Sequence, residues 1–200
     1  MNLPNRLTLL RLLISPLFLI LYVWHEDFGI SLAQLPYLLL FLLTIMELTD
    51  TFDGYFARKY NLVTDFGKVI DPMADSISHI TFFLSFTHPP IQIPIWVIFL
   101  FLYRESVIAS LRTICALKGF ALAARTSGKI KAVIQAIATY AVVLCLIPFS
   151  QGWLTQADLT HIATWIVGSV ALFTLFSMFE YIIANAPFIA KSFEKPASQV

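Results

Sequence analysis

Four aspartates with helical spacing stand out in a chain that carries few charges. Asp50 and Asp53 are three residues apart, and Asp71 and Asp75 are four residues apart. On a helix, either spacing places both side chains of a pair on one face. Only 12% of the 200 residues are charged and 58% are hydrophobic. Because ionisable groups within apolar segments are costly, their concentration here indicates a functional site.

The two pairs would meet if their helices lay side by side. The segment that connects them is short, which predicts antiparallel neighbours with all four carboxylates near the connection. Four anions in a poorly hydrated site repel one another, so either some take up protons or cations neutralise them. Mg²⁺ and Mn²⁺ prefer carboxylate oxygens and often share their ligands with substrate phosphates. Two such ions can also stabilise both oxygens of a phosphoryl displacement.

Small residues beside the acids leave space for a ligand or for a packed helix. Gly54 and Ala57 follow the first pair, and Gly67 precedes the second. Small residues at such spacing are also common in ordinary helix contacts within membranes. Arg58 likewise has two interpretations, since its guanidinium can bind a phosphate with two hydrogen bonds or anchor the helix at the cytoplasmic surface.

The composition requires a surface that faces lipid. Soluble domains are about 45–50% apolar and about 25% charged, whereas the mean hydropathy of this chain is +0.80. About 20 apolar helical residues cross a bilayer core, and about six such stretches are present. They lie near residues 7–24, 32–55, 65–86, 91–117, 127–147 and 159–183. We predict an all-α polytopic membrane protein of six transmembrane helices, preceded by a short N-terminal amphipathic lead.

Lys and Arg alternate between the two ends of the predicted helices. They occur before the first helix, after the second and fourth, and in the tail, whereas the other three loops carry none. The positive-inside rule therefore predicts that both termini are cytoplasmic, in a cell inner membrane protein whose active site faces the cytoplasm. Residues 1–200 are predicted to form one membrane domain, with 1–6 as a juxtamembrane lead and 187–200 as a cytoplasmic tail.

Other features exclude several classes of function. The net charge of +1 gives no indication of a nucleic-acid partner. Cys115 and Cys145 both fall within apolar runs, which is typical of packing residues rather than of a disulfide framework or a metal motif. The sequence shows no Ser-His or Cys-His pair that would indicate a covalent intermediate, so we expect a direct displacement.

Taken together, the motif is far more specific than its parts. It resembles, without a gap, the signature of the CDP-alcohol phosphatidyltransferase family: Asp50-x2-Asp53-Gly54-x2-Ala57-Arg58-x8-Gly67-x3-Asp71-x3-Asp75. The resemblance implies a six-helix membrane fold, a homodimer and a cytoplasmic active site. It implies that the four aspartates hold two Mg²⁺ or Mn²⁺ ions on the pyrophosphate of a CDP-lipid, and that Asp75 is also the general base. The residues implied to shape the cytidine and phosphate pocket are Gly54, Ala57, Arg58 and Gly67.

Two further stretches resemble the phosphatidylglycerophosphate synthases of that family. The N-terminal stretch, by this resemblance, brings Asn5, Thr8 and Arg11 to the nucleotide of a CDP-diacylglycerol donor; alternatively it is a helix start with a basic flank. The later stretch supplies a basic pocket for a phosphorylated acceptor, predicted to be sn-glycerol 3-phosphate. That pocket comprises Arg104, Arg112, Lys129 and Lys131, although the two lysines would equally serve as cytoplasmic anchors.

Several neighbouring residues carry weaker expectations. Glu105 adjoins Arg104 but is expected to point elsewhere, which leaves a bound phosphate as the better partner of that guanidinium. Ser76 stands where these synthases commonly carry Lys or Arg. Glu47 precedes Asp50 by one turn, where a small or apolar residue is usual; it could either face the site or lie protonated in a helix contact. His79, one turn past Asp75, could support that carboxylate, but we expect it to be a packed polar residue. Glu180 is expected to form a helix contact.

Three rival functions remain open at this point. The same chemistry with inositol phosphate or serine as the acceptor is the nearest, although free serine would not require so many basic residues. A cation transporter is another, because intramembrane acids often mark ion pathways. However, the acids cluster at one end, and no inverted repeat of the kind frequent in transporters is visible. A non-catalytic membrane scaffold would leave the four aspartates without a reason.

Overall fold

The computed structural model describes residues 3–60, 65–119 and 126–193, although not the side chains of every residue near the gaps. Within these ranges the chain forms six helices and no strand, which confirms the predicted all-α fold. The helices are α1 (Leu3–Val23), α2 (Leu35–Lys59), α3 (Asp65–Ser85), α4 (Ile95–Leu117), α5 (Thr126–Ser150) and α6 (Gln156–Phe193).

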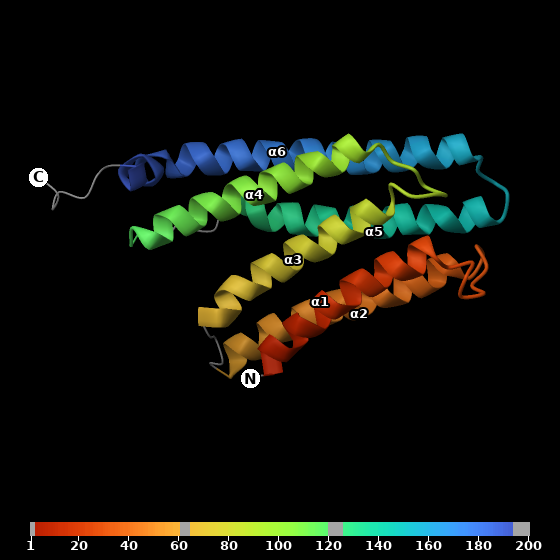
Figure 1. Ribbon diagram of the computed structural model, residues 1–200, viewed down its shortest axis with the longest axis horizontal. Helices are drawn as coiled ribbons and strands as arrows, with labels where there is room; N and C mark the ends of the chain where they lie inside the picture. Colours follow the sequence, from red (N-terminus) through yellow and green to blue (C-terminus); the bar gives the residue numbers. More distant parts are fainter. Residues whose placement is uncertain (1–2, 61–64, 120–125, 194–200) are drawn as a thin grey trace, which may run out of the picture.

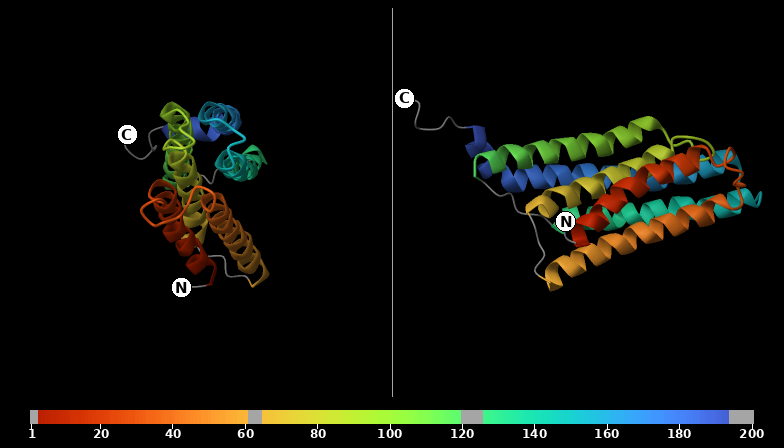
Figure 2. Two further views of the ribbon diagram at one scale, coloured as in Figure 1. Left: turned by 90° about the vertical axis from the view of Figure 1, so that its right-hand side faces the viewer. Right: turned by 60° about the horizontal axis from the view of Figure 1, so that its bottom comes forward.

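Consecutive helices run in opposite directions, so that α1 begins and α6 ends at the same end of the bundle (Figure 1). The helices form two groups (Figure 2). In the first, α1 packs against both α2 and α3; in the second, α6 packs against both α4 and α5. Contacts of α5 with α2 and α3, and of α4 with α3, join the groups.

The position of α1 corrects one expectation from the sequence. The short connection predicts that α2 and α3 are direct neighbours, but the two are not in extended contact within the described residues. Instead α1 fills the space between them. This arrangement is physically reasonable, since acid-bearing helices repel when nothing of opposite charge lies between them, and α1 carries the buried Arg11.

The ends of the outer helices also differ from the predicted bounds. Helix α1 already begins at Leu3, so most of the lead expected at residues 1–6 is its first turn. Helix α6 continues to Phe193, past residue 187, where the tail was expected to begin. Pro187 lies within α6, and its last turns leave the direction of the rest of the helix (Figure 2). Proline removes a helical hydrogen bond and commonly bends a helix in this way.

The bundle has the dimensions and surface of a polytopic membrane protein. In the described residues, four segments are long and apolar enough to cross a bilayer: 6–23, 35–52, 126–150 and 156–190. Large apolar side chains point outward, and Leu13, Trp165 and Ile183 are 71%, 78% and 73% exposed. Helices α3 and α4 both carry charged residues within their length, and they run alongside the other four.

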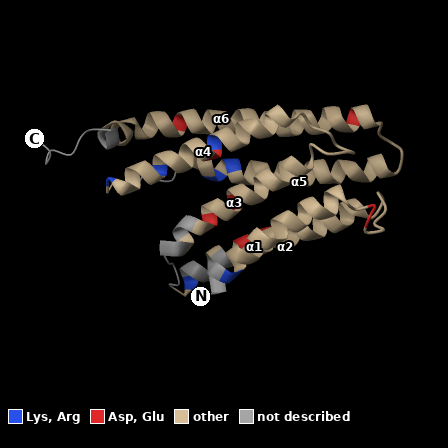
Figure 3. Cartoon of the chain, viewed as in Figure 1, with Lys and Arg blue, Asp and Glu red and all other residues tan. Residues whose placement is uncertain are grey.

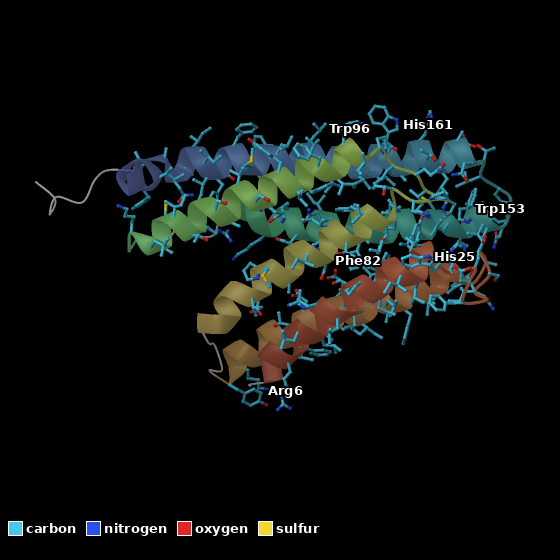
Figure 4. All side chains as sticks on the ribbon, in the orientation of Figure 1. Arg6, His25, Phe82, Trp96, Trp153 and His161 are labelled. Atoms are coloured by element: carbon cyan, nitrogen blue, oxygen red, sulfur yellow. The ribbon has the colours of Figure 1, made fainter. Side chains whose placement is uncertain are left out.

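Charged and aromatic residues occupy different parts of the bundle. Figure 3 shows Lys and Arg gathered toward the end at which α1 begins, whereas the opposite end carries Asp and Glu only. Figure 4 accordingly places Arg6 at the first end and His25 and Trp153 at the other. Between the ends lies an aromatic core, in which Phe18 packs on Phe82 with ring centroids 4.7 Å apart. The distribution matches the alternation of basic loops seen in the sequence.

The end that lacks Lys and Arg is held together by hydrogen bonds to the segment between α3 and α4. The hydroxyl of Tyr22 on α1 donates to the carbonyl of His88 (3.1 Å) and accepts from the amide of Ile91 (3.3 Å). Thr160 on α6 donates to the carbonyl of Ile91 (2.7 Å). One short segment therefore ties the two helix groups together at the end farthest from the acids.

The packing of α1 on α3 can be tested by cross-linking. Ser15 Oγ lies 2.7 Å from Ser78 Oγ, and both residues are buried. In a Ser15→Cys/Ser78→Cys variant, made in a chain with Cys115→Ala and Cys145→Ala, the sulfurs take the places of these oxygens. We expect oxidation to form a disulfide within one chain, because the Cβ atoms are then close to the separation of about 3.5–4.5 Å that a disulfide requires.

The readout is maleimide labelling after unfolding in detergent, which detects every thiol that has not been oxidised. The oxidised variant should show no label. A matched Ser15→Cys/Ser169→Cys pair should label fully, since Ser169 is exposed on α6 in the other helix group. Full labelling of the Ser15/Ser78 pair would contradict the placement of α1.

Candidate functional site

A pocket lies between α1, α2 and α3, in the charged half of the bundle. All three helices contribute to its lining, and three of its side chains are carboxylates from α2 and α3. Because those helices have little direct contact, α1 is needed to close the pocket. We call it the acid pocket. The residues that line it are Arg11, Met46, Glu47, Asp50, Asp75, Ser78, His79 and Phe82.

Helix α1 supplies a partner to one acid on each neighbouring helix. Arg11 Nη1 donates a hydrogen bond to Asp50 Oδ1 on α2, and Thr8 Oγ1 donates to Asp71 Oδ1 on α3 at 2.7 Å. Thr8 and Arg11 are three residues apart and so share a helix face. Both are buried. The structure thus places these two predicted residues directly beside the acids.

Asp75 has a partner that the sequence analysis did not assign to the site. Nε2 of His79, one turn later on α3, lies 3.2 Å from Asp75 Oδ1. His79 is buried, and its Nδ1 has no hydrogen-bond partner. A spacing of four residues on a helix was the available signal. His79 was expected to be a packed polar residue; its contact with Asp75 gives it a place in the site as well.

Glu47 also belongs to this pocket, which decides between the alternatives left open for it. Together with Asp50 and Asp75 it offers carboxylate oxygens, the ligands that hard divalent cations prefer. In the arrangement seen here, no group of three His, Cys, Asp or Glu among the described residues is gathered closely enough to hold one ion. Arg11 already engages Asp50. The carboxylate oxygens are nevertheless donors of the kind that divalent cations prefer, and Arg11 supplies the counter-charge of Asp50 in this arrangement.

Some predicted site residues have side chains outside the described part of the structure. These are Asn5, Asp53, Ala57 and Arg58. The backbones of all four lie within α1 or α2. Gly54 is partly buried on α2, and Gly67 is buried on α3. The two glycines therefore lie on the two helices that carry the acids.

A second charged cluster joins α3, α4 and α5. Glu105 on α4 accepts hydrogen bonds from Lys131 Nζ on α5 (2.6 Å) and from Ser76 Oγ on α3 (2.9 Å). It also accepts from Nη1 of Arg104, which lies 3.1 Å from both carboxylate oxygens. Arg104 and Lys131 are buried. We call Ser76, Arg104, Glu105 and Lys131 the Glu105 cluster.

The Glu105 cluster corrects one expectation. Adjacent helical residues do not face each other, which is why Glu105 was expected to be a poor partner of Arg104. Both side chains are long, however, and they bend toward the interior, where Lys131 approaches from another helix. Burial makes the pairing necessary, since an unpaired charge in an apolar interior is far more costly than a paired one. Arg104 therefore has a protein partner.

The other two predicted acceptor residues lie apart from this cluster. Arg112 is exposed on α4, and its Nε donates to the hydroxyl of Tyr181 on α6 at 3.2 Å. Its guanidinium also lies 5.4 Å from the centre of the Tyr181 ring. Lys129 is exposed in the first turn of α5. Of the four residues, the structure thus brings together Arg104 and Lys131.

Ser76 connects the two charged regions. It follows Asp75 directly in the sequence, yet its hydroxyl donates to Glu105, whereas Asp75 contacts His79. The acid pocket and the Glu105 cluster are therefore adjacent along α3. Anionic side chains that suit a cation-bound phosphate lie beside basic side chains that suit a second phosphate.

Comparison with known proteins identifies the family. A family model described as CDP-alcohol phosphatidyltransferase matches residues 1–175. The chain belongs to this family. It is 36% identical over 192 residues to the CDP-diacylglycerol--glycerol-3-phosphate 3-phosphatidyltransferase of Bacillus subtilis, with 92% of this chain and 95% of that protein covered.

Further relatives of this phosphatidyltransferase carry similar names. The chain is 34% identical over 181 residues to the CDP-diacylglycerol--glycerol-3-phosphate 3-phosphatidyltransferase of Rickettsia typhi, covering 90% of this chain and 96% of that protein. It is 37% identical over 139 residues to a probable phosphatidylglycerophosphate synthase of Mycobacterium tuberculosis, covering 68% and 63%. Family membership, with the apolar helices of the bundle, makes this protein a multi-pass membrane transferase.

Proposed function

We propose that this phosphatidyltransferase transfers the phosphatidyl group of CDP-diacylglycerol to sn-glycerol 3-phosphate, which yields phosphatidylglycerophosphate and CMP. The names of relatives that match nearly the whole chain support both substrates. The structural observation that carries the choice of a phosphorylated acceptor is the buried pair of Arg104 on α4 and Lys131 on α5. Their shared partner Glu105 also accepts a hydrogen bond from Ser76, which follows Asp75 on α3. Serine carries no phosphate for this pair to bind, and the names of the relatives favour glycerol 3-phosphate over inositol phosphate.

The proposed site faces the cytoplasm in a cell inner membrane. Lys and Arg gather at the end of the bundle where α1 begins, and the positive-inside rule assigns such an end to the cytoplasm. Soluble glycerol 3-phosphate would then reach the Glu105 cluster from water. CDP-diacylglycerol would enter from the membrane, with its acyl chains beside the exposed apolar side chains. Following the family resemblance, we also propose that the enzyme is a homodimer.

Divalent cations are the proposed cofactors. Asp50, Asp53, Asp71 and Asp75 would hold two Mg²⁺ or Mn²⁺ ions, and the acid pocket supports this with carboxylates from α2 and α3. Bound there, such ions would supply positive charge for the diphosphate of CDP-diacylglycerol. Thr8 and Arg11, released from Asp71 and Asp50, would become available to the nucleotide. The other residues proposed for the CDP-lipid are Asn5, Gly54, Ala57, Arg58 and Gly67.

The proposed reaction is a direct displacement. Asp75 accepts the proton of the attacking hydroxyl of glycerol 3-phosphate, and His79, in contact with Asp75, holds that carboxylate in position. The hydroxyl oxygen then forms a bond to the phosphorus that carries diacylglycerol, and the bond from that phosphorus to CMP breaks. Lys131 and Arg104 hold the acceptor's phosphate, which fixes the hydroxyl near the reacting phosphorus. Such positioning lowers the barrier by removing the entropic cost of bringing two substrates together.

The assignment of the acids is tested by removing single charges. We expect Asp75→Asn to lower CMP release by about 10²–10⁴-fold, the usual contribution of a positioned acid–base group. Asp71→Asn should also abolish most CMP release, because it removes a proposed ligand of the ions that stabilise the transferred phosphoryl group. Purified enzyme in lipid nanodiscs, with CDP-diacylglycerol, glycerol 3-phosphate and Mg²⁺, provides the assay. Asp27→Asn, an exposed change in the connection between α1 and α2, should retain activity. Near-normal turnover in both site variants would reject the assignment.

The proposed acceptor site is tested by comparing how one substitution changes the KM values of the two substrates. Lys131→Gln should raise the KM for glycerol 3-phosphate about 10–100-fold, because a hydrogen bond to a charged group is worth about 1.5–3 kcal/mol. The KM for CDP-diacylglycerol should change by less than about twofold, since that substrate does not contact Lys131 in the proposed mode. Lys118→Gln, at the exposed end of α4, is the control. An equal rise in both KM values would show that the substitution merely disturbs the fold.

A further inference from the structure

A carboxylate lies at the centre of the Glu105 cluster, which we propose as the binding site for the acceptor's phosphate. Glu105 engages both buried cations of that site, through Lys131 at 2.6 Å and Arg104 at 3.1 Å. Its side chain is only 16% exposed, so the contacts are largely shielded from water. An anionic ligand that enters the pocket must therefore share or take over hydrogen bonds that Glu105 already holds. The presence of Glu105 lowers the affinity of the pocket for any phosphate.

The proposed reaction explains why a lower affinity is useful. The phosphate of glycerol 3-phosphate takes no part in bond formation, and the product, phosphatidylglycerophosphate, still carries it. Groups that bind the acceptor's phosphate thus bind the product's phosphate as well. A pocket of buried cations alone would retain the product, since electrostatic attraction is strong where water is excluded. A second anion that replaces the phosphate lowers the cost of release, because the buried cations are then never left unpaired.

We propose that Glu105 is this second anion. In the empty enzyme Glu105 accepts hydrogen bonds from Lys131 and Arg104. When the acceptor binds, its phosphate takes over these hydrogen bonds, and Glu105 forms them again as the product leaves. Glu105 is a positioning residue, since it acts through the two cations and not on the reacting atoms. This inference rests on the proposed function, because it concerns the same acceptor site.

The hydrogen-bond pattern allows such an exchange. Lys131 bonds to Oε1 of Glu105, whereas Ser76 bonds to Oε2. Glu105 can therefore release Lys131 while Ser76 still holds its other oxygen close by. Arg104 bridges both oxygens through Nη1, and its buried Nε has no hydrogen-bond partner. The guanidinium thus has an unused donor for a phosphate oxygen.

The distinguishing prediction is a gain of affinity when the charge is removed. Glu105→Gln keeps the size of the side chain and one oxygen for Lys131 but no longer competes as an anion. We expect it to bind glycerol 3-phosphate about tenfold more tightly, which corresponds to about 1.4 kcal/mol. Its kcat should fall and inhibition by phosphatidylglycerophosphate should strengthen, because product release becomes slower. A residue that only supports the fold would weaken binding when replaced.

Affinity is measured by calorimetry on enzyme in nanodiscs without CDP-diacylglycerol, so that no turnover occurs. Glu105→Asp, which keeps the charge, should bind within about threefold of the unmodified enzyme, a difference of less than about 1 kcal/mol. Glu26→Gln, the same change at an exposed residue between α1 and α2, is the control and should bind as the unmodified enzyme does. Equal or weaker binding by Glu105→Gln would overturn the proposal.

Ser76→Ala should change the affinity for glycerol 3-phosphate in the opposite direction. It tests the proposal independently if Glu105→Gln does not fold. Without the hydroxyl of Ser76, the carboxylate depends more strongly on Lys131 and Arg104 and competes better with a phosphate. Glycerol 3-phosphate should then bind more weakly, and unchanged or tighter binding would contradict the role of Glu105. If the unmodified enzyme neither binds glycerol 3-phosphate nor releases CMP with it, but releases CMP with another alcohol, the proposed function itself fails.

Discussion

The structure depends on pairing charges between helices inside an apolar bundle. Asp50, whose side chain is about half exposed, and the largely buried Glu105 each receive a cation from a different helix, Arg11 from α1 and Lys131 from α5. Both of these cations are buried. An unpaired buried charge costs several kcal/mol, whereas a paired and hydrogen-bonded one is tolerated. The pairs also fix how the helices pack, because each one forms only when its two helices are correctly placed. Charges that a membrane protein would otherwise avoid thus hold the site together.

The two charged regions divide the proposed work. The acid pocket suits the cation-bound diphosphate of the donor, and the Glu105 cluster suits the phosphate of the acceptor. Asp75 and Ser76 are consecutive on α3, and their side chains serve one region each. In the proposed binding mode, this helix would set the distance between the two substrates. Hydrogen bonds from Tyr22 and Thr160 join the two helix groups at the far end, so that end supports the site without taking part in it.

The features that the sequence predicted well are those that depend on local periodicity. Apolar stretches of sufficient length predicted the helices, and the prediction that acids of both helices meet is confirmed for Asp50 and Asp75, which line one pocket. Thr8 and Arg11 were also predicted at the site, and both contact acids. The side chain of Asp53 lies outside the described residues, so its place at the site stays a prediction.

The features that the sequence did not predict are contacts between helices that are distant in the chain, which tertiary packing determines. Nothing in the spacing indicates that α1 lies between α2 and α3, because loop length constrains only which helices are connected. The pairing of Arg104 with Glu105 was missed for a similar reason: it depends on Lys131, a residue from a helix that approaches only in the folded protein. His79 was undervalued because a single histidine on an apolar helix is more often a packing residue.

Convergence of the carboxylates of α2 and α3 on shared cations is tested most directly by electron paramagnetic resonance of Mn²⁺. The enzyme is held in nanodiscs with CDP-diacylglycerol, and the metal is titrated without an acceptor. We predict a magnetically coupled pair of bound ions in each chain, lost in Asp75→Asn. Mn²⁺ that stays free in solution, or that binds Asp75→Asn just as well, would contradict the convergence of these acids on a common metal site.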